Sequence, residues 1–278
     1  MAPWRLASSL GYDPPVASPK DLNMPRAASP TSISSMQVDV TTRMGALTPA
    51  ISTGLHTLDG MLIGGLRAGV LMVVGGAPGV GRTAFALLLA YMAARARAAA
   101  IFASASLDET EVIARLAARA LHREYPDATT SYGAIWSGQA WQDDVTRRAV
   151  TQSVDTVVKK VGGSFYVHRT RPFASTAELG KGVAQLWGRY DKVLLVVDDM
   201  ETYAASVDEQ PEQAAMVNQS YESRIAQVGF ELAQLAEQGC AVVATVLARH
   251  LDLASPSATL AAELRPSSAA PENASERL

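Results

Sequence analysis

Five short apolar runs, separated by longer polar or amphipathic segments, dominate the hydrophobic pattern of this chain. The runs lie at 70–74, 99–103, 165–167, 193–197 and 241–246. Each is too short for a typical helix, and several are rich in β-branched residues, so each predicts a strand. The runs at 70–74 and 193–197 predict buried strands. The intervening segments predict helices at 83–92, from 108 onward, and at 142–161, 175–190 and 218–238. Helices alternating with strands predict an α/β fold in which helices flank a mostly parallel sheet.

Two connecting segments carry finer expectations. Residues 51–66 predict a turn that opens a short helix, with Thr57 as its N-cap, before Gly64-Gly65 leads into the first strand. His56, in the same segment, is expected on the surface. Residues 125–139 contain one proline and two glycines, and we expect irregular structure there.

The helix that begins after Asp108 has two distinct faces. Apolar residues recur every fourth position at Val112, Leu116 and Ala120, which predicts a buried face. Three arginines recur with the same spacing on another face: Arg115, Arg119 and Arg123. We interpret these arginines as solvated surface.

A glycine-rich turn joins the first strand to the first long helix. It reads Gly76-Ala77-Pro78-Gly79-Val80-Gly81-Arg82-Thr83 and has the spacing of a phosphate-binding P-loop, with Arg82 in place of the usual lysine. Backbone N–H groups of such a turn converge on phosphate oxygens, and the helix N-terminus adds positive potential. The predicted nucleotide-binding residues are Gly76, Ala77, Pro78, Gly79, Val80, Gly81, Arg82, Thr83 and Ala84, with the Thr83 hydroxyl placed to meet Mg²⁺. The alternative is a plain glycine turn between a core strand and a core helix.

A second acidic position follows the fourth strand. The apolar run 193–197 ends in Asp198-Asp199. In open α/β sheets, ligands gather at the carboxyl ends of strands, so Asp198 is predicted to hold Mg²⁺ through water opposite the P-loop. Asp199 is expected to be structural. The alternative for both residues is an acidic turn without a metal.

Composition narrows the class of protein. The 278 residues are 48% hydrophobic, carry a net charge of −3 and include one cysteine, Cys240. A net charge of −3 provides no overall positive potential that would attract nucleic acid or a membrane surface. One cysteine excludes an internal disulfide. Cys240 is expected to be a core thiol. We expect no signal peptide, no membrane span and a cytoplasmic protein. We further expect a disordered Pro/Ser/Ala-rich arm at 1–48, one folded domain at 49–252 and a disordered tail at 253–278.

The order of these motifs resembles the RecA-type motor domain of DnaB-like replicative helicases. The similarity runs from Ile51–Asp59 through Gly64–Leu66, the P-loop, Ser106–Asp108 and Ser137–Gln139 to the acid at Asp198, and covers about two hundred residues. It implies a RecA-like P-loop NTPase that binds ATP and Mg²⁺ between the subunits of a ring and moves along single-stranded DNA. It also implies roles for particular residues. Arg82 would face the β- and γ-phosphates, and Asp108, or the adjacent Glu109, would polarise the attacking water.

Several positions depart from the family pattern. Arginine replaces the P-loop lysine at Arg82, and Asp108 stands where the family has glutamate. Leu247 is the best match to a polar sensor at the end of the last strand, and neither Arg249 nor Arg265 can be assigned as an arginine finger. These departures predict ATP binding with weakened hydrolysis. The alternative is a non-catalytic nucleotide-binding or fold-only relative that acts by docking onto another replication or ATPase protein.

Overall fold

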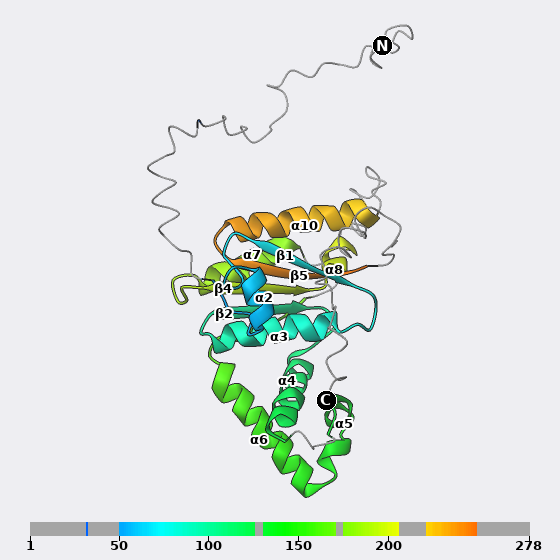
Figure 1. Ribbon diagram of the computed structural model, residues 1–278. Coiled ribbons are helices and arrows are strands. Elements are labelled where there is room, and N and C mark those ends of the chain that lie inside the picture. The colour runs from blue at the N-terminus through cyan, green and yellow to red at the C-terminus, as the bar shows by residue number, and fades with distance from the viewer. Residues whose placement is uncertain (1–31, 33–49, 126–129, 171–174, 206–220, 249–278) are drawn as a thin grey trace, which may run out of the picture. The chain divides into compact units, whose positions relative to one another are not determined.

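A five-stranded parallel sheet forms the centre of this computed structural model (Figure 1). The structure describes residue 32 and residues 50–125, 130–170, 175–205 and 221–248. The strands are β1 (Leu71–Gly76), β2 (Ala99–Ser104), β3 (Phe165–Arg169), β4 (Val193–Asp198) and β5 (Ala241–Leu247). Their order across the sheet is β1-β5-β4-β2-β3, and every neighbouring pair is parallel. All five runs predicted to be strands are therefore strands. Strand β4 is buried throughout, as predicted, whereas β1, also predicted to be buried, is only partly buried.

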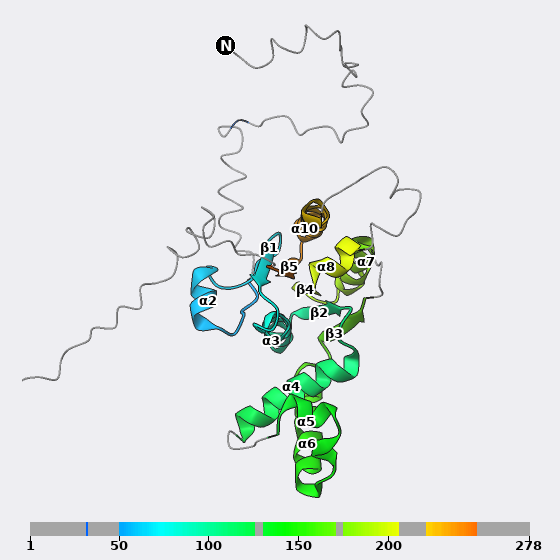
Figure 2. The ribbon, with the colours of Figure 1, turned by 90° about the vertical axis from the view of Figure 1, so that its right-hand side faces the viewer.

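Helices cover both faces of the sheet. The helical elements are α2 (His56–Met61), α3 (Arg82–Arg95), α4 (Glu109–Glu124), α5 (Tyr132–Trp136), the 3₁₀ helix η3 (Gln139–Trp141), α6 (Asp144–Val161), α7 (Thr176–Leu186), α8 (Met200–Ala205) and α10 (Tyr221–Glu237). Figures 1 and 2 show α3 on one face and α7, α8 and α10 on the other.

Alternation along the strands explains why two cores form. In β2, Ala100 and Phe102 pack with α3, whereas Ala99, Ile101 and Ala103 pack with α7 and α10. Successive side chains of a strand point to opposite faces, so a continuous apolar run supplies both layers at once. Because β1 and β4 both pair with β5 in parallel, the carboxyl ends of these three strands lie at the same end of the sheet.

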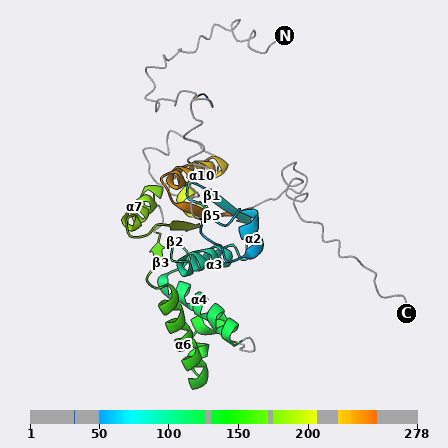
Figure 3. The same ribbon diagram turned by 60° about the vertical axis from the view of Figure 1, so that its left-hand side comes forward.

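Helices α4 and α6 lie beyond α3 (Figure 3), and together with α5 and η3 they build a third apolar cluster. Its buried members are Ala114, Leu121, Ile135, Ala140 and Val150. Side chains cap the N-termini of α4, α5 and α6. Asp108 accepts a hydrogen bond from the Glu111 N–H and Asp143 accepts one from the Thr146 N–H, both at 2.8 Å, and the Ser131 hydroxyl accepts one from the Ala134 N–H at 3.1 Å. This small cluster holds α4 against α6.

Several local predictions were wrong. Thr57 does not cap α2: the N-cap is Leu55, and Thr57 lies inside the helix. The segment expected to be irregular contains α5 and η3, because Ser131 caps α5 and Ile135 anchors it in the third cluster. Helix α7 ends at Leu186 rather than at Tyr190.

The arginines of α4 are not simply a solvated face. The Arg115 guanidinium lies 4.1 Å from the centre of the Tyr132 ring, and that of Arg119 lies 5.2 Å from the centre of the Tyr91 ring. Both side chains are only partly exposed, whereas Arg123 is exposed. The cation–π contacts hold two of the three guanidinium groups over aromatic rings.

Apart from Ser32, the predicted arm at 1–48 and the predicted tail at 253–278 lie outside the described residues, so both stay predictions. Within the described ranges, no helix is both long enough and apolar enough to cross a membrane. Cys240 is buried, as expected for a core thiol.

Candidate functional site

The predicted P-loop leaves β1 and enters α3 through two glycines with left-handed backbone. Gly79 has φ of 78° and Gly81 has φ of 94°, a region that side-chain-bearing residues rarely adopt. Gly81 is the N-cap of α3 and, having no side chain, caps none of the helix amides. The first N–H groups of a helix lack intrahelical partners, so the α3 N-terminus presents donors and positive potential to this turn.

The Arg82 side chain packs against Gly76 at the start of the turn. A Cβ atom placed on Gly76 would come within 3.2 Å of the Arg82 Cγ and 2.8 Å of a Val80 methyl carbon, so only glycine leaves room for this packing. The Arg82 Nη1 atom is buried and has no hydrogen-bond partner among the described residues. A buried guanidinium nitrogen without an acceptor is costly, and a phosphate oxygen is an acceptor that would satisfy it.

Asp198 ends β4 and faces the P-loop helix. Its Oδ1 atom accepts a 3.2 Å hydrogen bond from the Thr83 hydroxyl, the first contact between the two motifs that the sequence predicted to meet. The same oxygen accepts a 2.8 Å hydrogen bond from the Thr245 hydroxyl in β5. Asp198 is 5% exposed and Thr245 is fully buried. The predicted metal residues, Thr83 and Asp198, therefore lie side by side.

Burial raises the pKa of Asp198 above the ordinary value for aspartate, and the charge of Asp199 adds to that rise. The hydrogen bonds from Thr245 and Thr83 and the charge of Arg82 act in the opposite direction. The buried carboxylate is thus short of positive charge, and a cation would supply it. Among the described residues no group of three or more Asp, Glu, His or Cys side chains could hold a metal. One carboxylate and one hydroxyl suit Mg²⁺, which takes its other ligands from phosphates and water.

The two predicted catalytic acids follow β2, whose last residue, Ser104, pairs with Asp198 in the sheet register. Both acids therefore belong to the edge of the sheet that carries Asp198. The Asp108 carboxylate, however, is the N-cap of α4 and binds the Glu111 N–H. Glu109, the first residue of α4, is exposed. In the described part of the chain, neither carboxylate bonds to a P-loop residue.

The end of β5 lies against the P-loop. The Ala248 N–H donates a 3.0 Å hydrogen bond to the Gly76 carbonyl. Leu247, the expected sensor position, donates its backbone N–H to the Glu201 carboxylate. The polar side chain that reaches the site from β5 is instead Thr245, which sequence reasoning missed. The available signal was a single hydroxyl in an otherwise apolar run, Ala-Val-Val-Ala-Thr-Val-Leu.

Asp199 is structural in the described fold. Its Oδ1 atom accepts hydrogen bonds from the Thr202 N–H at 3.1 Å and from the Thr202 hydroxyl at 3.0 Å. These bonds hold the first turn of α8 against the end of β4. The peptide bond between Asp198 and Asp199 is cis.

Comparisons with solved structures give the same architecture. One match is to a solved ATPase domain, with a TM-score of 0.59 and 18% identity over 78% of this chain and 72% of that chain. Another is to a DnaB-like replicative helicase solved to show its interactions with primase, with a TM-score of 0.61 and 17% identity over 78% of this chain. This chain spans about half of that helicase, 48% of its length. A search among curated proteins gives no significant match.

Family comparison identifies the chain more directly than these distant structural likenesses do. The model of the DnaB-like helicase C-terminal domain matches residues 50–275, which include every element of the sheet and the whole candidate site. With the P-loop, the acid at the end of β4 and the parallel five-stranded sheet in place, the chain belongs to the DnaB-like helicase C-terminal domain family.

Proposed function

We propose that this protein binds ATP with Mg²⁺ at the junction of the β1–α3 turn and the end of β4. The observation that carries the proposal is the 3.2 Å contact between the Thr83 hydroxyl and Asp198, made beside the uncapped N-terminus of α3. A metal-binding hydroxyl and carboxylate next to free helix amides are the elements of a nucleotide triphosphate site.

Each residue of the site has a role in this proposal. Backbone N–H groups between Gly76 and Ala84, other than at Pro78, which has none, bind phosphate oxygens. The Arg82 guanidinium donates to the same oxygens through its unsatisfied nitrogen. Thr83 and Asp198 hold Mg²⁺, and Thr245 orients the Asp198 carboxylate. The bound metal would neutralise charge on the phosphate oxygens.

We further propose that turnover is slow. A water-activating acid must reach the site, but Asp108 is committed to the α4 N-cap and Glu109 is exposed. Arg82 has a broad planar head in place of a slender ammonium, and the two are not interchangeable in a tight cradle. The alternative is faster ATP turnover. In that case, binding of nucleotide or of a neighbouring subunit would release Asp108 from the α4 N-cap or bring Glu109 toward the P-loop.

Membership of the DnaB-like family also supports a proposal about what this protein assembles with. A DnaB-like helicase among the structural matches interacts with primase. By membership of the family we propose a homo-oligomer, a ring with nucleotide between subunits, that couples hydrolysis to movement on single-stranded DNA. The competing proposal is a non-catalytic relative that docks onto another replication or ATPase protein. The cap bond of Asp108 and the apolar side chain of Leu247 favour this competitor.

Isothermal titration with ATP and Mg²⁺, followed by a phosphate-release assay on the same sample with and without single-stranded DNA, separates these proposals. We expect Mg²⁺-dependent ATP binding and little phosphate release. Brisk, DNA-stimulated release would show that the departures from the family pattern do not weaken the chemistry. Failure to bind ATP at millimolar concentration would leave only the fold-only relative.

A further inference from the structure

A cavity of about 370 Å³ opens between α3, α4 and α6. Its lining residues are Tyr91, Arg95, Arg119, Ala120, Arg123, Glu124, Thr156 and Lys160. Four of these side chains are cations and one is a carboxylate. The volume lies in the range of small-molecule sites.

The four cations have no acidic partner among the residues that the structure describes. In the described part of the fold, none of Arg95, Arg119, Arg123 and Lys160 forms an ion pair, although Glu124 lines the same cavity. Arg95 makes only a long contact, 4.0 Å, to the sulfur of Met92. Burial lowers the pKa of Arg119, and the nearby charges of Arg123 and Arg95 lower it further, while Tyr91 acts in the opposite direction.

Helix ends explain part of this clustering. Arg95, Arg123 and Lys160 lie in the last turns of α3, α4 and α6, where the helix dipole favours cations. That effect acts within each helix and does not require three helices to direct their charges at one cavity. Arg119 is not in a last turn, and its guanidinium is held over the buried Tyr91 ring. This placement fixes one cation at the wall of the cavity.

From this convergence of unpaired cations around a concave surface, we propose that the cavity binds a small, multiply charged phosphate compound. Guanidinium groups match phosphate geometry through paired N–H donors. Cations that three helices direct at one half-open cavity act together on a compact anion, whereas a polymer backbone is usually bound along a groove.

This cavity is separate from the proposed ATP site. The P-loop meets α3 at Arg82, and the cavity lies at the other end of the helix, at Arg95. A helix of this length spans about 20 Å, so the two ends are too far apart for one triphosphate to reach both. The proposal therefore stands whether or not the P-loop binds nucleotide.

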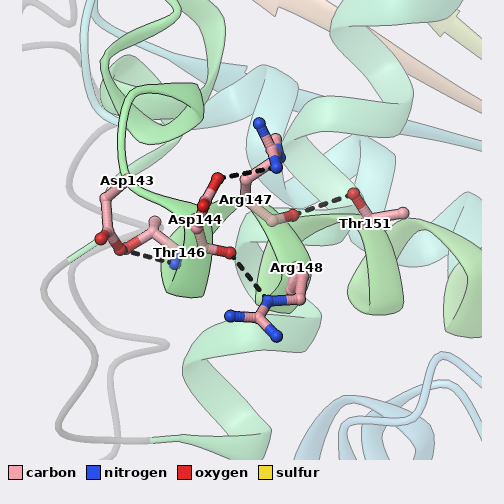
Figure 4. A network of polar contacts seen from close by, with 6 residues as sticks. All are labelled: Asp143, Asp144, Thr146, Arg147, Arg148 and Thr151. Carbon is pink, nitrogen blue, oxygen red and sulfur yellow. Dashed lines mark hydrogen bonds and ion pairs between the residues drawn. The ribbon is translucent and has the colours of Figure 1, made fainter.

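The test titrates inorganic pyrophosphate into the full chain without ATP or Mg²⁺, because ATP is itself a multiply charged phosphate compound that would enter the same cavity. Any pyrophosphate held at the P-loop binds the wild type and the variants alike, so only binding at the cavity differs between them. The test variants are Arg119→Gln/Arg123→Gln and Arg123→Gln/Lys160→Gln, and the second leaves the packed Arg119 untouched. The matched control is Arg147→Gln/Arg148→Gln at the start of α6 (Figure 4). There both arginines are exposed and contact Asp144, Arg147 as an ion pair of 2.7 Å and Arg148 through the backbone carbonyl at 3.1 Å.

We expect pyrophosphate to bind the wild type and the control alike, and to bind each test variant at least about tenfold more weakly, since each loses two charge-assisted contacts. Circular dichroism checks that the variants are folded. Equal affinity in all four proteins would overturn the proposal, as would absence of binding to the wild type. A parallel titration with a single-stranded oligonucleotide separates the two sources of phosphate. If the test variants weaken only oligonucleotide binding, the cavity is part of a nucleic-acid surface and the small-anion proposal is wrong.

Discussion

The hydroxyl of Thr245 donates a 2.8 Å hydrogen bond to the Asp198 carboxylate from the neighbouring strand. Both side chains are buried in the sheet. A carboxyl held in such a place costs free energy unless it is hydrogen-bonded. The bond from Thr245 offsets part of that cost and, in the proposed function, fixes the carboxylate toward the metal.

Replacing Thr245 with valine removes this bond and keeps the side-chain shape. We expect the free energy of unfolding to fall by about 1–3 kcal/mol, because a buried acceptor loses a donor. We also expect weaker Mg²⁺-dependent ATP binding. Urea denaturation and calorimetric titration measure the two effects. Thr245→Ser keeps the hydroxyl and is the control; if it loses as much ATP affinity as the valine variant, the hydroxyl is not responsible.

Two aspartates should give opposite pH dependences of stability. Burial raises the pKa of Asp198 above 3.8. The contribution of Asp198 to the free energy of unfolding is therefore fully present below pH 3.8, where the carboxyl is protonated. That contribution is lost as the pH rises through the pKa of the folded state. Partial burial would also raise the pKa of Asp59, but hydrogen bonds from Ser52 and Thr53 outweigh it and lower that pKa below 3.8. Its contribution is therefore present above pH 3.8 and is lost as the pH falls through the lower folded value.

Asp198→Asn and Asp59→Asn test these signs by thermal unfolding across the acidic range without metal. Relative to wild type, Asp198→Asn should gain stability as the pH rises, because asparagine keeps an acceptor for both threonines and carries no charge. Asp59→Asn should lose stability as the pH rises. With Mg²⁺ and ATP added, only Asp198→Asn should fail to gain melting temperature. The same pH trend in both variants would contradict the assignment.

Replacing Arg82 with lysine should raise the rate of phosphate release if the arginine head limits the chemistry. The aliphatic stem packs against Gly76 and is shared by both residues, so the fold should be unaffected. Phosphate-release assays compare this variant with Arg82→Gln, which removes the charge and should lower ATP affinity. If the rate of phosphate release were unchanged in Arg82→Lys, Asp108 and Glu109, rather than Arg82, would limit that rate.

Gly81→Ala tests whether the left-handed N-cap is needed. An added Cβ meets no atom within 4 Å at Gly81 or at Gly163, but only Gly81 has a positive φ. We expect Gly81→Ala to lose about 1–2 kcal/mol of unfolding free energy through backbone strain, and Gly163→Ala to lose much less. Chemical denaturation measures both. Similar losses in the two variants would mean that the positive φ of Gly81 does not account for its loss of unfolding free energy.

Patterns local in sequence predicted most of the fold. The five apolar runs became the five strands of the sheet, of which β2 and β4 are buried along their whole length, and the Gly76–Thr83 spacing correctly placed the turn between β1 and α3. The meeting of Thr83 with Asp198 also followed, because parallel strands end at one edge. Their roles in binding nucleotide and metal remain predictions.

What the sequence did not show depends on contacts between distant segments. Thr245 reaches Asp198 only because β5 lies next to β4, an order that no local pattern specifies. Arg119 is held by Tyr91, which belongs to a different helix, so the spacing of arginines in α4 could not reveal it. Leu55, rather than Thr57, is the N-cap of α2, because Asp59 accepts hydrogen bonds from both Ser52 and Thr53 and orders the preceding turn.

The single thiol of this protein has a practical consequence. Cys240 is buried between α10 and β5, and burial raises its pKa to about 11. The native chain should therefore react very slowly with maleimide dyes, which need a thiolate. A cysteine introduced on an exposed helix would then be the one fast-labelling position, and paired dyes on neighbouring copies could report how the protein assembles without any native residue having to be removed.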